Sequence, residues 1–231
     1  MYAENTISFL RKLGKLNNRQ VVLTCSSLDY SKGDPIKAFK KAFGKLEVVQ
    51  SQEFHKISPS ISIDQVKIDG TDSEVPMQKL LETVKHSPSK KLVIFTSFIS
   101  RSSDIQELLE KEGILTSILH ADMEVEERSE NLLDFLKGRT RVIVGTELLS
   151  RGLELDTDHV IMYNIPSNPA SLLQRIGRTG RMGKFGRVTL FVRPEDEKIV
   201  KQATQSSHFL STEAKPGRAR LNLQSFLDED K

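Results

Sequence analysis

Short apolar runs rich in valine and isoleucine alternate with polar and charged segments from Lys91 onward. The runs have the length and composition of buried strands. They occupy Leu92 to Phe95, Val142 to Val144, Val160 to Tyr163 and Val188 to Val192. Between them, apolar residues recur every three to four positions, as on one face of a helix, at Ile105, Leu108 and Leu109 and at Leu132, Leu133 and Leu136. Strand alternating with helix predicts an α/β fold, a parallel sheet sandwiched by helices.

Polar residues follow several of these predicted strands. Thr96 and Ser97 follow the first, His120 to Asp122 follow the next, and Thr146 follows a third. In parallel sheets, ligands gather at the carboxyl ends of the strands. We therefore expect a binding site at this edge of the sheet.

The chain before Lys91 is organised differently. Its pattern predicts a helix over 4–16, a buried strand from Val21 to Thr24 and a second helix from Pro35 to Phe43. One strand and two helices cannot enclose a core of their own, so we interpret residues 1–50 as a partial strand-helix remnant of another domain. The Ser-rich residues 51–66 are predicted to be a linker, although Ile61 to Ile68 is itself strand-like. Residues 67–206 would form the main domain, and 207–231 a C-terminal extension that is partly mobile.

Composition narrows the class of protein. Hydrophobic residues make up 37% of the 231 residues, and no stretch approaches the ~20 consecutive apolar residues that a membrane span requires. The N-terminus has no basic segment followed by an apolar core and a small-residue cleavage site. Cys25 is the single cysteine, so it can form neither an internal disulfide nor a cysteine cluster for a metal. We expect an intracellular protein with no membrane association and no metal site of its own.

The positive charge of the chain is concentrated in one window. The formal net charge is only +3, yet no acidic residue lies between Asp158 and Glu195. The basic residues in that window are Arg175, Arg178, Arg181, Lys184, Arg187 and Arg193. Residues 102–137 are acidic on balance. This distribution is typical of an anion-facing edge, and ordinary solvated surface charges remain the alternative.

The most informative stretch is residues 174–181, Gln-Arg-Ile-Gly-Arg-Thr-Gly-Arg. Its three arginines are spaced by three residues, about one helical turn apart, and the glycines between them allow close approach to a partner. A guanidinium stays charged, and its planar donors match phosphate oxygens. Two adjacent guanidinium groups can therefore clamp a phosphoryl group during transfer. A basic surface turn is the alternative.

This octapeptide resembles the sixth motif of superfamily 2 helicases, which has the sequence His-Arg-Ile-Gly-Arg-Thr-Gly-Arg in DEAD-box proteins. Here Gln174 takes the place of the His. Residues 141–154 resemble the fifth motif, Thr-Asp-x-x-x-Arg-Gly-x-Asp, with Glu147 and Glu154 in place of its aspartates. Residues 119–128 resemble His-Gly-Asp-Met followed by Gln-x-x-Arg, with Ala121 for the glycine and Val125 for the glutamine.

Two further segments extend the resemblance. Residues 92–97 are similar to the strand and loop of the fourth motif. Residues 19–28 resemble the close of the first motor domain, where Cys25, Ser26 and Ser27 stand at the family's Ser-Ala-Thr. Order and spacing agree over about 90–200. The chain thus looks like the C-terminal RecA-like domain of a DEAD-box ATP-dependent RNA helicase, with the tail end of the N-terminal RecA-like domain.

The resemblance implies roles for individual residues. Arg178 and Arg181 would be arginine fingers that reach ATP, and Glu154 would contact its ribose hydroxyls. The RNA backbone, single-stranded or duplex, would be held by Ser97, Ala121, Arg128 and Thr146. Coupling between the domains would involve Ser26, Ser27, Arg151 and Gln174. ATP with Mg²⁺ would be bound mainly by the missing N-terminal RecA-like domain.

Two other conspicuous residues have simpler interpretations. His120 at a strand end is expected to be a hydrogen-bonded structural histidine, since no second ligand lies at zinc-like spacing. Cys25 follows an apolar run and is expected to be a small buried residue.

Two functional hypotheses remain open. The chain contains no Gly-x-x-x-x-Gly-Lys-Ser/Thr pattern, so it is predicted to be inactive alone, as a fragment of an RNA-stimulated ATPase that unwinds RNA or remodels ribonucleoprotein. The alternative is a catalytically inactive helicase-like module that binds RNA or protein cofactors. Gln174 and the Cys25 to Ser27 segment depart from the family and keep this alternative open, whereas the presence of both arginines favours the ATPase.

Overall fold

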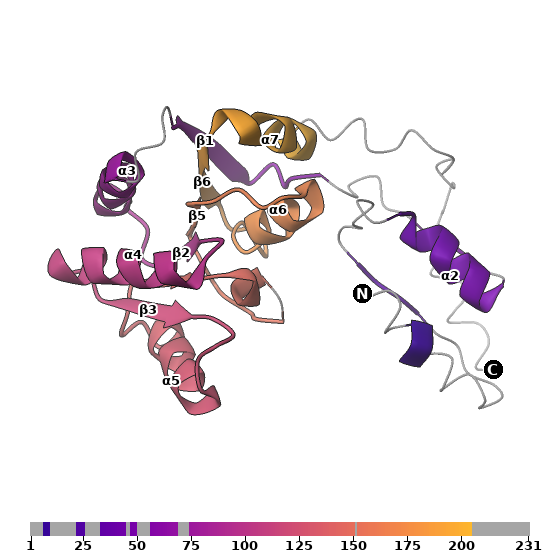
Figure 1. The fold of residues 1–231 in the computed structure, drawn as a ribbon, viewed down its shortest axis with the longest axis horizontal. Coiled ribbons are helices and arrows are strands. Elements are labelled where there is room, and N and C mark those ends of the chain that lie inside the picture. The colour runs from indigo at the N-terminus through magenta and orange to yellow at the C-terminus, as the bar shows by residue number, and fades with distance from the viewer. Residues whose placement is uncertain are drawn as a thin grey trace. The chain divides into compact units, whose positions relative to one another are not determined.

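The computed structural model describes residues 7–9, 22–25, 33–44, 47–49, 56–68, 74–150 and 152–204 (Figure 1). The chain divides into two compact units, one formed by 1–54 with 207–231 and the other by 55–206. Among the helices in these described ranges, none is long and apolar enough to cross a membrane.

In the first unit, the predicted helix from Pro35 to Phe43 is confirmed as α2 (Pro35–Phe43). The Asp34 side chain caps its start by accepting hydrogen bonds from the backbone N–H groups of residues 36 and 37, at 2.9 and 3.2 Å. Gly44, at φ 76°, ends it. Phe39 and Phe43 stack along one side, with ring centroids 6.2 Å apart.

The prediction of a buried strand from Val21 to Thr24 is wrong for the residues that the structure describes. Residues 22–25 have no regular secondary structure, and Val22 is 72% exposed. Cys25, expected to be buried, is also exposed. An apolar run becomes a buried strand only when neighbouring strands pair with it and a core covers it. Of the helix predicted over 4–16, the structure describes only residues 7–9, which are helical.

The second unit is built on one parallel sheet, in the order β1-β6-β5-β2-β4-β3. Its strands are β1 (Ile61–Lys67), β2 (Leu92–Phe95), β3 (Thr116–Leu119), β4 (Val142–Gly145), β5 (His159–Met162) and β6 (Gly186–Val192). The four apolar runs of the sequence thus form the four adjacent central strands, β6, β5, β2 and β4.

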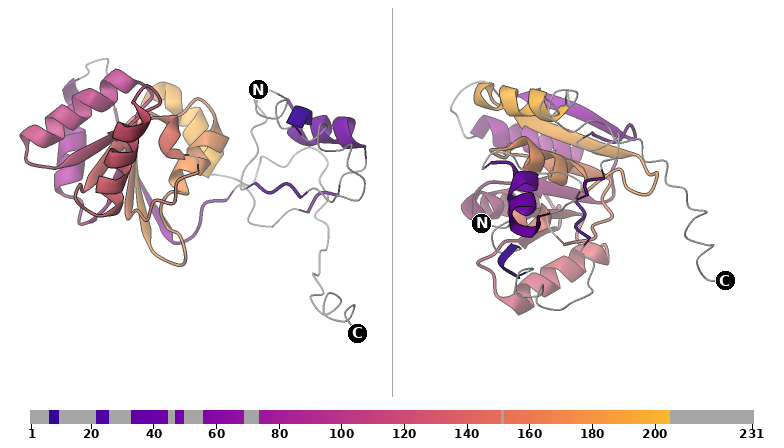
Figure 2. Two further views of the ribbon diagram at one scale, coloured as in Figure 1. Left: turned by 90° about the horizontal axis from the view of Figure 1, so that it is seen from below. Right: turned by 90° about the vertical axis from the view of Figure 1, so that its right-hand side faces the viewer.

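Helices cover both faces of this sheet (Figures 1 and 2). The helices are α3 (Glu74–Lys85), α4 (Ile99–Lys111), α5 (Val125–Leu136), α6 (Pro169–Ile176) and α7 (Glu197–Thr204), with 3₁₀ turns η1 (Glu147–Ser150) and η2 (Pro194–Asp196). Side chains alternate along each strand, so Val93 and Phe95 enter a core with α5, α6 and α7. Leu92 and Ile94 enter a second core with α3 and α4. The predicted α/β sandwich is confirmed.

The linker prediction needs a correction at its end. Residues 61–66 were included in the linker 51–66, but they form most of β1, which pairs with β6 from Ile61↔Gly186 to Lys67↔Val192. The strand-like character of Ile61 to Ile68 is confirmed instead. Hydrogen bonds from β6 and the packing of Ile61 and Ile63 against one core hold this segment in the sheet.

Candidate nucleotide and RNA site

Three of the predicted RNA-binding residues lie at the carboxyl edge of the sheet. Ser97, Thr146 and Ala121 come one or two residues after the ends of β2, β4 and β3, which are neighbours in the sheet. Adjacent strands lie ~4.8 Å apart, so the three strand ends span about 10 Å. The structure therefore brings together residues that are up to 49 positions apart in the chain, as the strand pattern predicted.

Ser97 is exposed, and its backbone is fixed from the neighbouring strand end. Its N–H donates to the Asn164 side-chain oxygen at 3.0 Å. Asn164 follows β5 closely, so a fourth strand end contributes to this edge. Sequence reasoning missed Asn164, since no motif signals it.

The position of half-buried Thr146 is set by the glycine before it. A Cβ on Gly145 would collide with the Leu119 carbonyl oxygen and the Leu149 side chain, so only glycine fits where β4 ends. The Thr146 carbonyl then accepts from the Leu149 N–H at 3.1 Å, which starts the tight turn η1.

Ala121 and Arg128 lie around the loop between β3 and α5. The Met123 N–H donates to the His120 carbonyl at 3.4 Å, which closes a compact turn with exposed Ala121 inside it. Arg128 is half-buried in the first turns of α5. His120 was expected to be hydrogen-bonded, but its Nδ1 is buried and has no partner in the described ranges. No group of metal-binding side chains occurs in those ranges either.

The arginine-rich motif begins on α6 and continues beyond it. The Asn168 side chain caps α6 by accepting from the Ser171 N–H at 2.8 Å, and the helix ends at Ile176, before Gly177. Arg175 is therefore helical, whereas Arg178 and Arg181 lie in the turns that follow. The expectation that the three arginines share helical spacing is wrong, because the chain leaves the helix between the first and the second.

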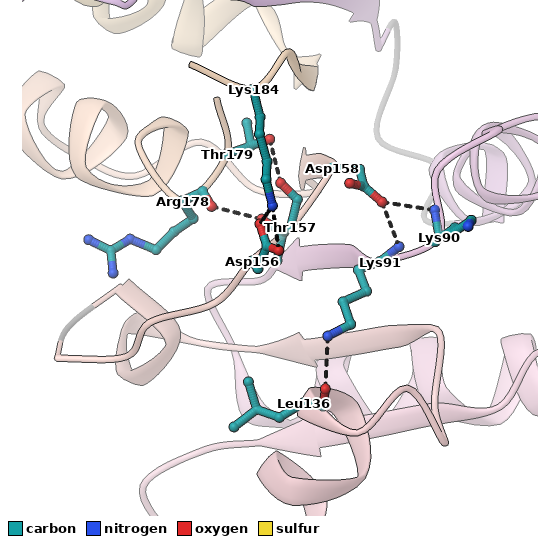
Figure 3. Close-up of polar contacts among 9 residues, drawn as sticks. All are labelled: Lys90, Lys91, Leu136, Asp156, Thr157, Asp158, Arg178, Thr179 and Lys184. Atoms are coloured by element: carbon teal, nitrogen blue, oxygen red, sulfur yellow. Dashed lines mark hydrogen bonds and ion pairs between the residues drawn. The ribbon is translucent and has the colours of Figure 1, made fainter. Parts of the chain in front are cut away.

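The second half of the motif lies at the opposite, amino-terminal edge of the sheet. Thr179 pairs with Thr157, just before β5: the Thr157 hydroxyl donates to the Arg178 carbonyl at 2.8 Å, and the Thr179 hydroxyl donates to the Thr157 carbonyl at 2.7 Å (Figure 3). Gly180 packs against Ile61 at the start of β1. The predicted ATP and RNA residues are therefore at different edges of the sheet.

Arg178 and Arg181 are held by backbone carbonyls. Arg178 Nη1 donates to the Leu153 carbonyl at 2.9 Å, and Arg181 Nε donates to the Gly177 carbonyl at 2.7 Å. In the described part of the chain, neither has a carboxylate partner. Burial, followed by the nearby charge of Arg181, lowers the pKa of Arg178. A nearby anion would relieve the repulsion between two such cations.

Lys184, a nearby cation of the same loop, is already neutralised. Lys184 Nζ donates to both carboxylate oxygens of Asp156, at 2.9 and 2.7 Å, and the Arg178 guanidinium extends away from this pair (Figure 3). Glu154 directly follows Leu153, whose carbonyl binds Arg178, and its side chain is exposed. Glu154, which is predicted to bind ribose hydroxyls, is thus on the same segment that positions Arg178.

An ion pair between buried Arg175 and partly exposed Glu147 connects the arginine-rich motif to the segment after β4. Arg175 is only 5% exposed; its Nη2 donates to a Glu147 carboxylate oxygen at 3.0 Å, and its guanidinium lies 5.1 Å from the centroid of the Phe95 ring. Glu147 directly follows Thr146, so this pair links α6 to the carboxyl edge. Sequence reasoning noted both residues but not their pairing, which needs the tertiary fold.

The predicted coupling residues are only partly visible. Gln174 is half-buried on α6, and its carbonyl accepts from Arg178 Nε at 3.3 Å. Ser26, Ser27 and Arg151 lie outside the described residues.

Comparison with known proteins adds the family. Residues 76–183 match the model of the Helicase conserved C-terminal domain. DEAD-box ATP-dependent RNA helicase 39 of Arabidopsis thaliana is 32% identical over 167 residues, which cover 71% of this chain and 27% of that protein. ATP-dependent RNA helicase DBP5 of Yarrowia lipolytica is 32% identical over 153 residues, 63% of this chain and 31% of that protein. The chain thus spans about a quarter to a third of these relatives.

Solved structures agree. The C-terminal domain of the DEAD-box protein Dbp5 has 28% sequence identity and a TM-score of 0.56, over 62% of this chain and 84% of that one. S. cerevisiae Dbp5 bound to RNA and ADP BeF3 has 25% identity and a TM-score of 0.73, over 87% of this chain and 51% of that one.

The six-stranded parallel sheet, its helices and the matched sequence define a helicase C-terminal domain with a RecA-like fold. The chain therefore contains a C-terminal domain of the DEAD-box RNA helicase type, and its relatives are DEAD-box RNA helicases.

Proposed function

We propose that this domain is the second motor half of an ATP-dependent RNA helicase. It binds the RNA backbone at the carboxyl edge of its sheet, and it supplies Arg178 and Arg181 to ATP held with Mg²⁺ by a first RecA-like domain, for unwinding RNA or remodelling ribonucleoprotein. The observation that carries the proposal is the pair of neighbouring guanidinium groups without a carboxylate partner in the described ranges.

The nucleotide part of the proposal rests on electrostatics. Negative charge on the oxygens of a phosphoryl group must be stabilised during its transfer, and fixed cations do this without rearranging. Carbonyl contacts hold Arg178 and Arg181 in place, and the terminal nitrogens of Arg181 have no hydrogen-bond partner among the described residues. An exposed Glu154 on the adjacent segment can accept hydrogen bonds from ribose hydroxyls.

The RNA part rests on hydrogen-bond donors at the other edge. Ser97 and Thr146 offer hydroxyls, Arg128 a guanidinium, and Ala121 its backbone N–H. Beside Ser97, α4 begins without a side-chain cap and without an acidic residue in its first turn, so its positive end is not neutralised there. Such donors recognise phosphates and not base edges, so binding would be largely independent of sequence.

The coupling part of the proposal follows from the path of α6. Its buried Arg175 pairs with Glu147 beside the RNA edge, and the turns after it carry Arg178 and Arg181 at the nucleotide edge. A shift of α6 would thus move residues at both edges of the sheet. We propose that Gln174, with Arg151, Ser26 and Ser27, transmits this shift between the two domains.

One observation favours a second candidate, a catalytically inactive module that binds RNA or an assembly partner. Gln174 stands where the family has a histidine, and a glutamine cannot change its charge or protonation as an imidazole can.

Stimulation of ATP turnover by RNA separates the two functions. The 231-residue chain alone should show no turnover above a buffer blank, since it contains no phosphate-binding Gly-x-x-x-x-Gly-Lys-Ser/Thr loop. A protein that carries both motor domains should hydrolyse ATP faster when single-stranded RNA is added. RNA binding without any turnover by the two-domain protein would favour the inactive module.

A further inference from the structure

Phe98 presents an aromatic ring at the RNA edge. It directly follows Ser97 after β2 and is 68% exposed. In the described part of the second unit, the other phenylalanine exposed to this degree is Phe185, at 89%, just before β6 at the opposite edge. The remaining phenylalanines there, Phe95, Phe135 and Phe191, are buried.

The exposure of Phe98 does not come from a loose loop. Its carbonyl accepts three hydrogen bonds, from the Thr96 hydroxyl at 3.1 Å and from the Ser102 N–H and hydroxyl at 3.3 and 3.4 Å. The Thr96 and Ser102 hydroxyls, both fully buried, are 2.8 Å apart. On the other side, Asn164 binds the N–H of Ser97. The backbone is therefore fixed, and a partner binding this ring would lose little conformational entropy.

We propose that Phe98 stacks on a nucleobase of the RNA strand whose phosphates are held at this edge; the proposal rests on the RNA-binding function given above. Donors such as Ser97, Thr146 and Arg128 bind the sugar-phosphate backbone and leave the bases without contact. An aromatic ring beside them adds an apolar surface that accepts the face of any base, which is how single strands are bound without a sequence code.

Binding of short RNA strands to the 231-residue chain tests this. The two probes are a labelled oligoadenylate and an abasic oligonucleotide of the same length and backbone, measured by fluorescence anisotropy at low salt. Phe98→Ala should weaken oligoadenylate binding by about fivefold to hundredfold, the range for loss of one stacked base, and leave abasic binding unchanged. Phe185→Ala, which removes an equally exposed ring from the other edge, should change neither.

Phe98→Trp supplies a direct readout, because the chain has no tryptophan. Its emission should be quenched by oligoadenylate and not by the abasic strand, and Phe185→Trp should be quenched by neither. Thermal unfolding followed by circular dichroism should be the same for wild type and Phe98→Ala, since an exposed ring contributes little packing.

The outcomes distinguish this inference from the function on which it rests. If Phe98→Ala binds both strands like wild type while Arg128→Ala and Thr146→Ala bind more weakly, the RNA site stands and stacking by Phe98 is refuted; the ring would then belong to a protein contact. If Arg128→Ala and Thr146→Ala also bind like wild type, the RNA site itself is refuted and the stacking proposal with it.

Discussion

At the scale of single residues, the main feature is the pair of cations formed by Arg178 and Arg181. Burial and mutual repulsion lower the pKa of Arg178, and the backbone carbonyls that hold both side chains are neutral. Keeping two positive charges together is unfavourable without an anion, which supports the proposal that these residues bind a phosphate group.

Arg178→Ala or Arg181→Ala in a protein with both motor domains should therefore reduce ATP turnover far more than ATP binding. Arginine fingers act mainly on the transition state, and their loss costs about 10³ to 10⁵ in rate, or ~4 to 7 kcal/mol. Steady-state turnover and nucleotide titration measure the two effects.

Arg187→Ala is the control for bulk charge. Arg187 is a nearby basic residue whose Nε lies 2.8 Å from an Asp64 carboxylate oxygen, so its charge is already paired. Equal and mild effects of all three substitutions would mean that the arginines form only an electrostatic patch.

Glycines of the same motif have a different, steric role. Gly180 lies at φ +66°, and a Cβ there would collide with the Ile61 side chain; Gly183 lies at φ +77°, with nothing within 4 Å of such a Cβ. Both substitutions to alanine strain the backbone by ~1 to 2 kcal/mol, but only Gly180→Ala also overpacks the start of β1, by a further ~1 to 3 kcal/mol.

We therefore predict that Gly180→Ala lowers the free energy of unfolding more than Gly183→Ala does. Urea denaturation of both variants measures the difference. Equal losses would show that β1 moves aside without cost, and that the glycine is needed only for its backbone angle.

At the scale of elements, a buried histidine joins the segment after α3 to β5 and β6. Fully buried His159 contacts the hydroxyls of Ser87 and Thr189 through its two ring nitrogens, both at 2.9 Å. Its pKa is lowered to about 4, mainly by burial; the positive charges of Arg187 and Arg141 contribute to this lowering, and the negative charge of Asp64 opposes it. The neutral ring is the form that fits between these elements.

Stability should fall in acid because of this residue. The folded pKa lies below the unfolded value of about 6.5, so the contribution of neutral His159 is complete above pH 6.5 and is lost as the pH falls toward 4. The expected loss is about 2 to 3 kcal/mol between pH 7 and pH ~4.5. Denaturant unfolding across this range measures it.

The matched variant is His159→Gln, which keeps a neutral polar side chain between the same hydroxyls. Its stability should depend less on pH in this window than that of wild type, whatever its absolute value. Parallel pH profiles of the two proteins would show that carboxylates elsewhere cause the acid sensitivity.

At the scale of the whole domain, the two edges of the sheet proposed to bind ATP and RNA differ in charge. The edge proposed for the nucleotide carries two arginines without a counter-ion in the described ranges. At the edge proposed for RNA, Arg101 and Arg175 are paired with Asp104 and Glu147, and Arg128 is the guanidinium without a carboxylate partner among the described residues. Few phosphates are neutralised there, so RNA binding by this chain alone should be weak and only moderately sensitive to salt.

The logarithm of RNA affinity should thus fall with the logarithm of salt concentration with a slope of about −0.7 for each phosphate contacted. Arg128→Ala should make this slope shallower by about 0.7, and Arg187→Ala, at the amino-terminal edge, should leave it unchanged. Titrations at several salt concentrations measure the slopes. Tight, salt-insensitive binding of one particular sequence would contradict backbone recognition.

Local patterns in the sequence were sufficient for most of the domain. Alternation and short apolar runs identified β2, β4, β5 and β6, because a strand buried on both faces needs a continuous apolar composition wherever it lies in the sheet. The motif around Arg178 and Arg181 indicated the helicase family in the same way, because neighbouring residues carry it. The roles proposed for the site residues stay predictions.

Contacts between distant segments were decided only by the tertiary structure. Residues 61–66, predicted to be a linker, form a strand because β1 pairs with β6. Because α6 ends at Ile176, Arg178 and Arg181 lie at the edge opposite Ser97 and Thr146. The ion pair of Arg175 and Glu147 has the same origin. Sequence determines what each segment can form, because that depends on neighbouring side chains; which segments meet depends on strand order and crossover path, which no local pattern encodes.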